Sequence, residues 1–197
     1  MKFDLIIAGV GGQGIIFTTN VIGRACIKEG KKILAAETHG MAQRGGSVET
    51  HIRIGTEFGP LIPKKKADAL LGFEPIEALR YSHFLSRKGI AIINTEKIIP
   101  PSCVFPGKFT YPDVNYLMSK IKEVFGKVII LNALKLARES GSIMTVNMVM
   151  LGVLTNYLPL EKKTIIQAIK ELVPEKLIEA NLRAFEKGVN FYLTYKS

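Results

Sequence analysis

Short apolar runs alternate along the chain with amphipathic stretches, as in folds where strands alternate with helices. Residues 3–10 are an almost unbroken apolar run, typical of a strand buried on both faces, and residues 15–28 carry apolar side chains at helical spacing up to the stop at Gly30. We expect further strands over 32–36, 48–54, 67–72, 89–94 and 127–131, and further helices over 73–86, 114–125, 133–139, 145–158, 161–172 and 174–195. The pattern predicts an α/β fold: a single Rossmann-like domain over residues 1–197, with a mostly parallel sheet covered by helices on both faces.

The strand expected over residues 48–54 alternates strictly between two kinds of side chain. Its apolar positions fall on one face, and Glu49, His51 and Arg53 fall on the other. Because the second face carries charge, we expect it to be exposed to water or covered by a partner.

Residues 140–160 contain no charged side chain and are long enough to cross a bilayer. Asn147, Gly152, Asn156 and Pro159 interrupt this stretch, however, and the sequence offers no second span. We therefore expect a helix buried in a core or beneath a partner subunit, and no membrane association.

Composition narrows the class of protein further. The chain has 197 residues and a hydrophobic fraction of 47%, enough for a core without disulfides. Its two cysteines, Cys26 and Cys103, stand far apart, so the sequence has no zinc or iron–sulfur spacing and we expect no metal site. No signal peptide is visible, and we expect a cytoplasmic protein.

The formal net charge is +10, and its lysines are scattered rather than gathered in a nucleic-acid-binding motif. Most of them fit solvated helix faces, and no nucleic acid is expected as a partner. A polyanionic ligand or an acidic partner is the alternative interpretation.

The first glycine-rich loop follows directly on the first strand and reads Gly9-Val10-Gly11-Gly12-Gln13-Gly14. Glycines at this spacing permit a tight turn and let backbone N–H groups approach a diphosphate at the start of a helix. The pattern predicts a phosphate-binding loop, although a turn that only packs a helix on a sheet would need similar residues.

A second loop, Glu37-Thr38-His39-Gly40-Met41-Ala42-Gln43-Arg44-Gly45-Gly46-Ser47, follows the second strand at the sheet edge where ligands bind in such folds. Glu37 occupies the place of the acid that binds a ribose in NAD-dependent and FAD-dependent enzymes. The long polar loop after it argues against that role, and Arg44 could equally form a salt bridge to Glu37.

Together the two loops resemble the gamma-type subunits of 2-oxoacid:ferredoxin oxidoreductases, and within that family the small (beta) subunits of the indolepyruvate enzymes. The likeness continues through residues 51–55, 67–75 and 147–152. The pyruvate-type relatives carry Tyr-Gly-Pro-Glu-x-Arg-Gly-Gly in the second loop. The sequence His39-Gly40-Met41-Ala42-Gln43-Arg44-Gly45-Gly46 here favours aryl pyruvates instead.

The resemblance implies oxidative decarboxylation of a 2-oxoacid, with coenzyme A taking the acyl group and ferredoxin the electrons. It places thiamine diphosphate and iron–sulfur clusters in a large partner subunit, whose thiamine site this chain covers. It implies that this chain has no catalytic residue of its own and contributes coenzyme A binding. The residues implied in binding are Gly9, Gly11, Gly12, Gln13, Gly14, Glu37, Met41, Arg44, Gly45, Gly46, Ser47 and Asn147.

Two other functions stay open at this point. The chain could be a self-contained NAD-dependent or FAD-dependent oxidoreductase that uses residues 9–14 and Glu37, or a non-catalytic interaction subunit. For the leading interpretation we expect the isolated chain to be folded but inactive, and to self-associate, for instance as a homodimer, through the surface that the partner would cover.

Overall fold

In the computed structural model, which describes residues 1–39, 45–99 and 110–196, six strands form one sheet in the order β2-β3-β1-β4-β5-β6. The strand β3 runs antiparallel to both of its neighbours, and the remaining neighbouring strands pair in parallel. The strands are β1 (Phe3–Val10), β2 (Ile33–His39), β3 (Ser47–Ile54), β4 (Ala67–Gly72), β5 (Leu85–Asn94) and β6 (Val128–Leu131). The mostly parallel α/β sheet is thus confirmed.

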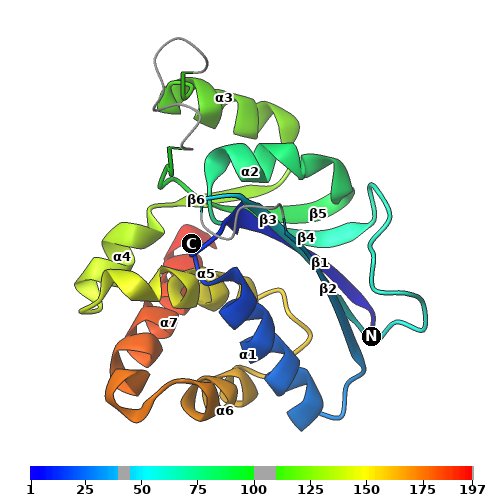
Figure 1. Cartoon of the computed structure of the whole chain (residues 1–197), viewed down its shortest axis with the longest axis vertical. Helices are drawn as coiled ribbons and strands as arrows, with labels where there is room; N and C mark the ends of the chain where they lie inside the picture. The colour runs from blue at the N-terminus through cyan, green and yellow to red at the C-terminus, as the bar shows by residue number, and fades with distance from the viewer. Residues whose placement is uncertain (40–44, 100–109, 197) are drawn as a thin grey trace.

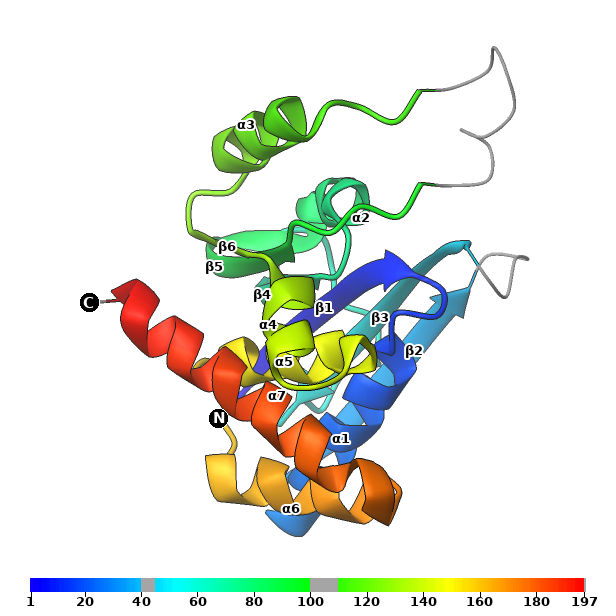
Figure 2. The ribbon, with the colours of Figure 1, turned by 90° about the vertical axis from the view of Figure 1, so that its left-hand side faces the viewer.

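Helices cover both faces of the sheet, as Figures 1 and 2 show. One face carries α1 (Ile15–Lys28), α4 (Ala133–Glu139), α5 (Val146–Thr155), α6 (Lys162–Leu172) and α7 (Glu175–Lys196). The other carries α2 (Pro75–Arg80) and α3 (Val114–Val124). Single 3-10 turns lie at Ser82–Phe84 and Ile143–Thr145.

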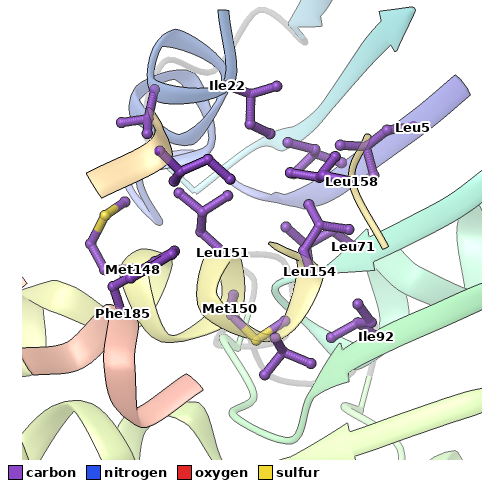
Figure 3. Packing of buried hydrophobic residues seen from close by; sticks show 14 of the residues in the cluster. Leu5, Ile22, Leu71, Ile92, Met148, Met150, Leu151, Leu154, Leu158 and Phe185 are labelled. Atoms are coloured by element: carbon purple, nitrogen blue, oxygen red, sulfur yellow. The ribbon is translucent and has the colours of Figure 1, made fainter. Parts of the chain in front are cut away.

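The uncharged stretch 140–160 forms the centre of the larger core. Residues 147–155 of α5 are all buried, and Figure 3 shows Leu151 and Leu154 among side chains of β1, α1, β4 and β5. This confirms the expectation of a buried helix. Within the described ranges, no helix combines the length and the apolar character needed to cross a membrane.

Glycines set the distance between α5 and α7. A Cβ on Gly152 would overlap the carbonyl oxygen of Phe185, and one on Gly188 would overlap that of Val149. The two backbones therefore pack in direct contact.

The helix expected over residues 73–86 is shorter than predicted, because α2 ends at Arg80. The backbone after Arg80 forms hydrogen bonds to another segment instead of continuing the helix. The N–H groups of Lys65 and Lys66 donate to the carbonyl oxygens of His83 and Phe84, at 3.0 and 2.9 Å. These bonds draw the chain into the extended start of β5.

The charged face of β3 was predicted to be exposed to water or covered by a partner, and this prediction was wrong. His51 and Arg53 are buried, with exposed fractions of 2% and 4%, beneath the chain's own connection between β3 and β4. Arg53 forms a bidentate ion pair with the buried Asp4 of β1, with nitrogen–oxygen distances of 2.9 and 3.2 Å. Charge on an alternating strand therefore marked an internal salt bridge and not a wet surface.

Candidate functional site

The first glycine loop links the carboxyl end of β1 to α1. Gly12 and Gly14 adopt φ angles of +102° and +79°, a region that side chains with a Cβ rarely adopt. Gly14 caps α1 without a side chain, so the first N–H groups of the helix point out of the loop without an intrahelical acceptor. This geometry offers donors and a partial positive charge to an anion.

Gln13 holds this loop together from inside. Its side-chain oxygen accepts from the N–H of Val10 at 2.7 Å, and its side-chain nitrogen donates to the carbonyl oxygen of Phe73 at 3.0 Å. A Cβ on Gly9 would lie 2.6 Å from the same amide oxygen. Gln13 and Gly9 therefore shape the loop by packing and hydrogen bonding to the chain itself.

The second glycine loop meets the first. The N–H of Gly11 donates to the carbonyl oxygen of Gly46 at 2.9 Å, and Gly45 has a φ of +76°. The structure thus brings Gly11, Gly12 and Gly14 together with Gly45 and Gly46 at the carboxyl end of β1.

Ser47 ties the second loop to the opposite helix layer. Its hydroxyl donates to a carboxylate oxygen of Glu77 at 2.5 Å and lies 3.0 Å from the hydroxyl of Tyr81. Glu77 is buried and also accepts from Arg80 at 3.2 Å. Burial raises the pKa of Tyr81, so its hydroxyl stays neutral, and because Ser47 gives its own proton to Glu77 its oxygen is free to accept from Tyr81.

Asn147, in the first turn of α5, faces the first loop. A Cβ on Gly14 would lie 2.7 Å from its side-chain nitrogen, so the glycine is required by this neighbour as well as by its φ. Asn147 is 7% exposed, and its side-chain oxygen is buried without a hydrogen-bond partner. Among the residues that the structure describes, only Thr50 has a buried side-chain oxygen in the same state. A buried acceptor without a donor is costly, which makes this atom a candidate ligand contact.

A pocket of about 220 Å³ opens beside Asn147. Its walls come from α1, the start of α5 and the start of α7, and are largely apolar, with Phe17, Met144 and Leu177 among them. An elongated ligand bound at the glycine loop could therefore lay an apolar portion here and donate an N–H to Asn147.

Glu37 lies away from this cluster. In register it is level with Thr50 of β3 and Ile7 of β1, and β3 separates it from β1. Adjacent strands stand ~4.8 Å apart, so the insertion moves Glu37 out by one strand relative to the acid of a dinucleotide fold, where the second strand adjoins the first. Met41 and Arg44 lie outside the residues that the structure describes.

Comparison with known proteins decides the family. A family model described as pyruvate ferredoxin/flavodoxin oxidoreductase matches residues 4–191. The chain belongs to this family. It is 42% identical over 192 residues to the indolepyruvate oxidoreductase subunit IorB of Archaeoglobus fulgidus, covering 96% of this chain and 95% of the relative. It is 27% identical over 194 residues, covering 95% and 96%, to the common gamma subunit of the pyruvate/ketoisovalerate oxidoreductases of Thermococcus kodakarensis.

Solved structures of the family share the fold. The gamma subunit of a keto/oxoacid ferredoxin oxidoreductase from Geobacter sulfurreducens superposes with a TM-score of 0.70 at 21% identity, covering 98% of this chain and 99% of that one. The 2-oxoglutarate:ferredoxin oxidoreductase from Magnetococcus marinus, solved with coenzyme A bound, gives 0.72 at 20% identity, covering 98% of this chain and 31% of that one.

Reasoning from sequence missed Glu77 and Tyr81, which lie 30 and 34 positions after Ser47. The run Phe73-Glu74-Pro75 offered one signal, because an acidic N-cap before proline fixes where α2 begins. That helix carries Glu77 to the start of β3, but no sequence pattern indicates that it meets Ser47.

Proposed function

We propose that this chain is the small subunit of a 2-oxoacid:ferredoxin oxidoreductase that acts on aryl pyruvates, with indolepyruvate as the first candidate, and that residues 1–197 act in it as one domain. In the overall reaction the substrate loses carbon dioxide, ferredoxin accepts the electron pair, and the acyl group forms a thioester with coenzyme A as the thiol proton is released. The likeness to the IorB subunits over nearly the whole chain supports this assignment.

For this chain we propose a binding role: the two glycine loops hold the diphosphate of coenzyme A. The observation that carries this role is the cluster of Gly12, Gly14 and Asn147, where backbone donors adjoin a buried unpaired amide oxygen. The pantetheine arm of coenzyme A combines apolar carbon segments with two amides, a hydroxyl and the terminal thiol. An amide N–H of that arm could donate the hydrogen bond that the side-chain oxygen of Asn147 lacks within the chain.

Thiamine diphosphate and the iron–sulfur clusters belong, in this proposal, to the large partner subunit. The donor set of the described residues does not fit a cluster, and Cys103 lies outside them. Burial raises the pKa of the Cys26 thiol to about 12, so it is not a thiolate ligand at neutral pH. In the described ranges, no three His, Cys, Asp or Glu side chains gather as a metal site would require. When bound in the partner, thiamine diphosphate supplies the carbanion chemistry of decarboxylation.

A stand-alone NAD-dependent or FAD-dependent enzyme is less well supported. Glu37 is separated from β1 by the antiparallel β3, so it does not adjoin the glycine loop as a ribose-binding acid would. The family match over residues 4–191 supports a subunit role in its place.

Reconstitution tests the proposal. We expect the purified chain alone to reduce no acceptor, and the chain mixed with its large subunit to reduce ferredoxin in the presence of indolepyruvate and coenzyme A. Titration of each preparation with NAD, FAD and coenzyme A should show binding of coenzyme A alone. Turnover by the isolated chain, or tight binding of NAD or FAD to it, would contradict the proposal.

A further inference from the structure

The connection between β3 and β4, residues 55–66, lies at the edge of the sheet opposite the glycine loops. It passes beside the N-terminus (Figure 1), where a Cβ on Gly55 would overlap the carbonyl oxygen of Met1. This connection contains no helix or strand and is longer than most connections in compact domains. We call residues 55–66 the β3–β4 loop.

Buried polar groups hold this loop in one shape. Arg53, already paired with Asp4, also donates to the carbonyl oxygens of Gly59 and Leu61, at 2.8 and 3.3 Å. The N–H of Ile62 donates to Nδ1 of His51 at 3.0 Å, and the Ile62 side chain is 2% exposed. Buried side chains of β3 therefore hold the loop at Gly59, Leu61 and Ile62.

The C-terminal end of the β3–β4 loop is also fixed, and it includes a residue in a strained backbone conformation. Lys65 has a φ of +60°. Among the described residues, it is the only one other than glycine with a positive φ. Such conformations persist where surrounding bonds enforce them, and they often mark functional segments. The bonds here are those from Lys65 and Lys66 to His83 and Phe84, at 3.0 and 2.9 Å.

The rigid loop presents apolar side chains to solvent. Phe58 is 72% exposed and Leu61 is 60% exposed, and both line an open groove of about 610 Å³ together with Pro60 and Pro63. Exposed apolar groups on a preorganised frame are typical of protein interfaces, where a few large side chains provide most of the binding free energy.

Lysines dominate the charged side chains at the solvent-exposed rim of the groove. Lys2 and Lys66 line it, and Lys64 and Lys65 are exposed beside it. Among the described residues, no salt bridge joins Lys64, Lys65 or Lys66 to a carboxylate. The exposed acid of the loop, Glu57, pairs with Lys32 at 3.3 Å. The groove therefore combines an apolar floor with a lysine-rich rim, in which Lys2 pairs with Asp4 at 3.1 Å and Lys64, Lys65 and Lys66 have no carboxylate partner among the described residues.

We propose that the β3–β4 loop is a docking site for an acidic segment of the large partner subunit, with apolar side chains against Phe58 and Leu61 and carboxylates against Lys64 and Lys66. This rests on the proposed function for the identity of the partner. A second copy of the chain is a poor occupant, because a symmetric contact would set the same lysines against one another in a molecule whose net charge is +10.

Binding kinetics between this chain and the purified large subunit test the docking site. The double variant Phe58→Ser/Leu61→Ser should raise the Kd at least about tenfold through a faster off-rate. The double variant Lys64→Gln/Lys66→Gln should slow association and flatten its dependence on salt. Matched controls are Leu193→Ser, which changes a leucine that is 58% exposed on α7, and Lys176→Gln, which changes an exposed lysine there. Both controls should bind like wild type.

The outcomes separate this inference from the proposed function. Wild-type affinity and salt dependence in both loop variants, with circular dichroism showing them folded, would overturn the docking site and leave the subunit assignment standing. Loss of self-association in the loop variants, with binding to the large subunit intact, would also overturn it. Failure of the wild-type chain to bind the large subunit would overturn both.

Discussion

The N–H of Gly11 donates to the carbonyl oxygen of Gly46 at 2.9 Å. These residues belong to two loops separated by α1 and β2, and this bond joins the loops at one sheet edge. Because Ser47 is bonded in turn to Glu77, the contact extends from the loop before α1 to the helix layer on the opposite face. The candidate coenzyme A site is thus a junction of three segments rather than one glycine turn.

Alanine substitutions at Gly12 and Gly14 should separate backbone strain from steric overlap. Both residues have positive φ, but a Cβ on Gly12 meets nothing within 4 Å, whereas one on Gly14 lies 2.7 Å from Asn147. Gly12→Ala should lower the free energy of unfolding by ~1–2 kcal/mol, the cost of the left-handed conformation. Gly14→Ala should cost more, and the addition of Asn147→Ala should recover part of the difference.

Chemical denaturation of wild type, Gly14→Ala, Asn147→Ala and the double variant measures this recovery as a double-mutant cycle, and Gly12→Ala is measured beside them. Equal losses for Gly12→Ala and Gly14→Ala, with no recovery in the double variant, would show that Asn147 does not restrict the loop.

Removal of the Ser47 hydroxyl should loosen the second loop. Ser47→Ala leaves the buried Glu77 without one of its donors, which we expect to lower the free energy of unfolding by ~1–3 kcal/mol. Coenzyme A should bind more weakly to the assembled complex, since the loop that carries Gly46 loses its tether to Glu77 and keeps only the backbone bond to Gly11. Ser119→Ala, in the exposed part of α3, is the matched control and should change neither quantity. Wild-type coenzyme A affinity in Ser47→Ala would mean that this tether is irrelevant to the site.

Stability should fall as the pH drops below the ordinary pKa of histidine. Burial of His51 lowers its pKa from 6.5 in the folded protein, so the unfolded chain binds more protons than the folded chain below that pH. The contribution of neutral His51 to the free energy of unfolding is therefore complete above pH 6.5. It decreases as the pH falls from 6.5 to the lower pKa of His51 in the folded protein.

The variant His51→Asn should lack this component, because its side-chain oxygen can still accept from Ile62 but does not titrate in this range. Thermal melting of both proteins between pH 7 and pH 5 measures the difference. Parallel curves for the two proteins would assign the pH dependence to other groups.

The buried pair of Asp4 and Arg53 should be among the most sensitive positions in the chain. Asp4→Asn removes a carboxylate that is 1% exposed and leaves the guanidinium without its counter-ion, which should cost ~3–5 kcal/mol in the free energy of unfolding. Glu123→Gln breaks the exposed pair with Lys120 and should cost less than ~1 kcal/mol. Similar losses for the two variants in urea denaturation would contradict this account of Arg53.

The sequence predicted those parts of the fold whose signals are local. The apolar run of β1, the glycines after it and the helical spacing of α1 lie within one short segment, and the structure contains all three. The neighbours of β3 could not be predicted in this way. Its alternation is compatible with any position in a sheet, and only the tertiary fold inserts it between β1 and β2.

The same limit applied to the site. Gly12 and Gly14 were predictable because their roles depend on backbone angles within one loop. The partners of Ser47 and the unpaired oxygen of Asn147 depend on contacts between distant segments, for which the sequence carried no pattern.

Coenzyme A binding by the variant Asn147→Leu tests the central claim most directly. Leucine keeps the approximate shape of the side chain and removes the buried unpaired oxygen, so the melting temperature should stay the same or rise. If that oxygen receives a hydrogen bond from coenzyme A, the variant complex should bind a coenzyme A analogue without its thiol roughly three- to tenfold more weakly in calorimetric titration. An unchanged Kd in an intact variant complex would contradict the claim that this edge of the sheet binds coenzyme A through Asn147.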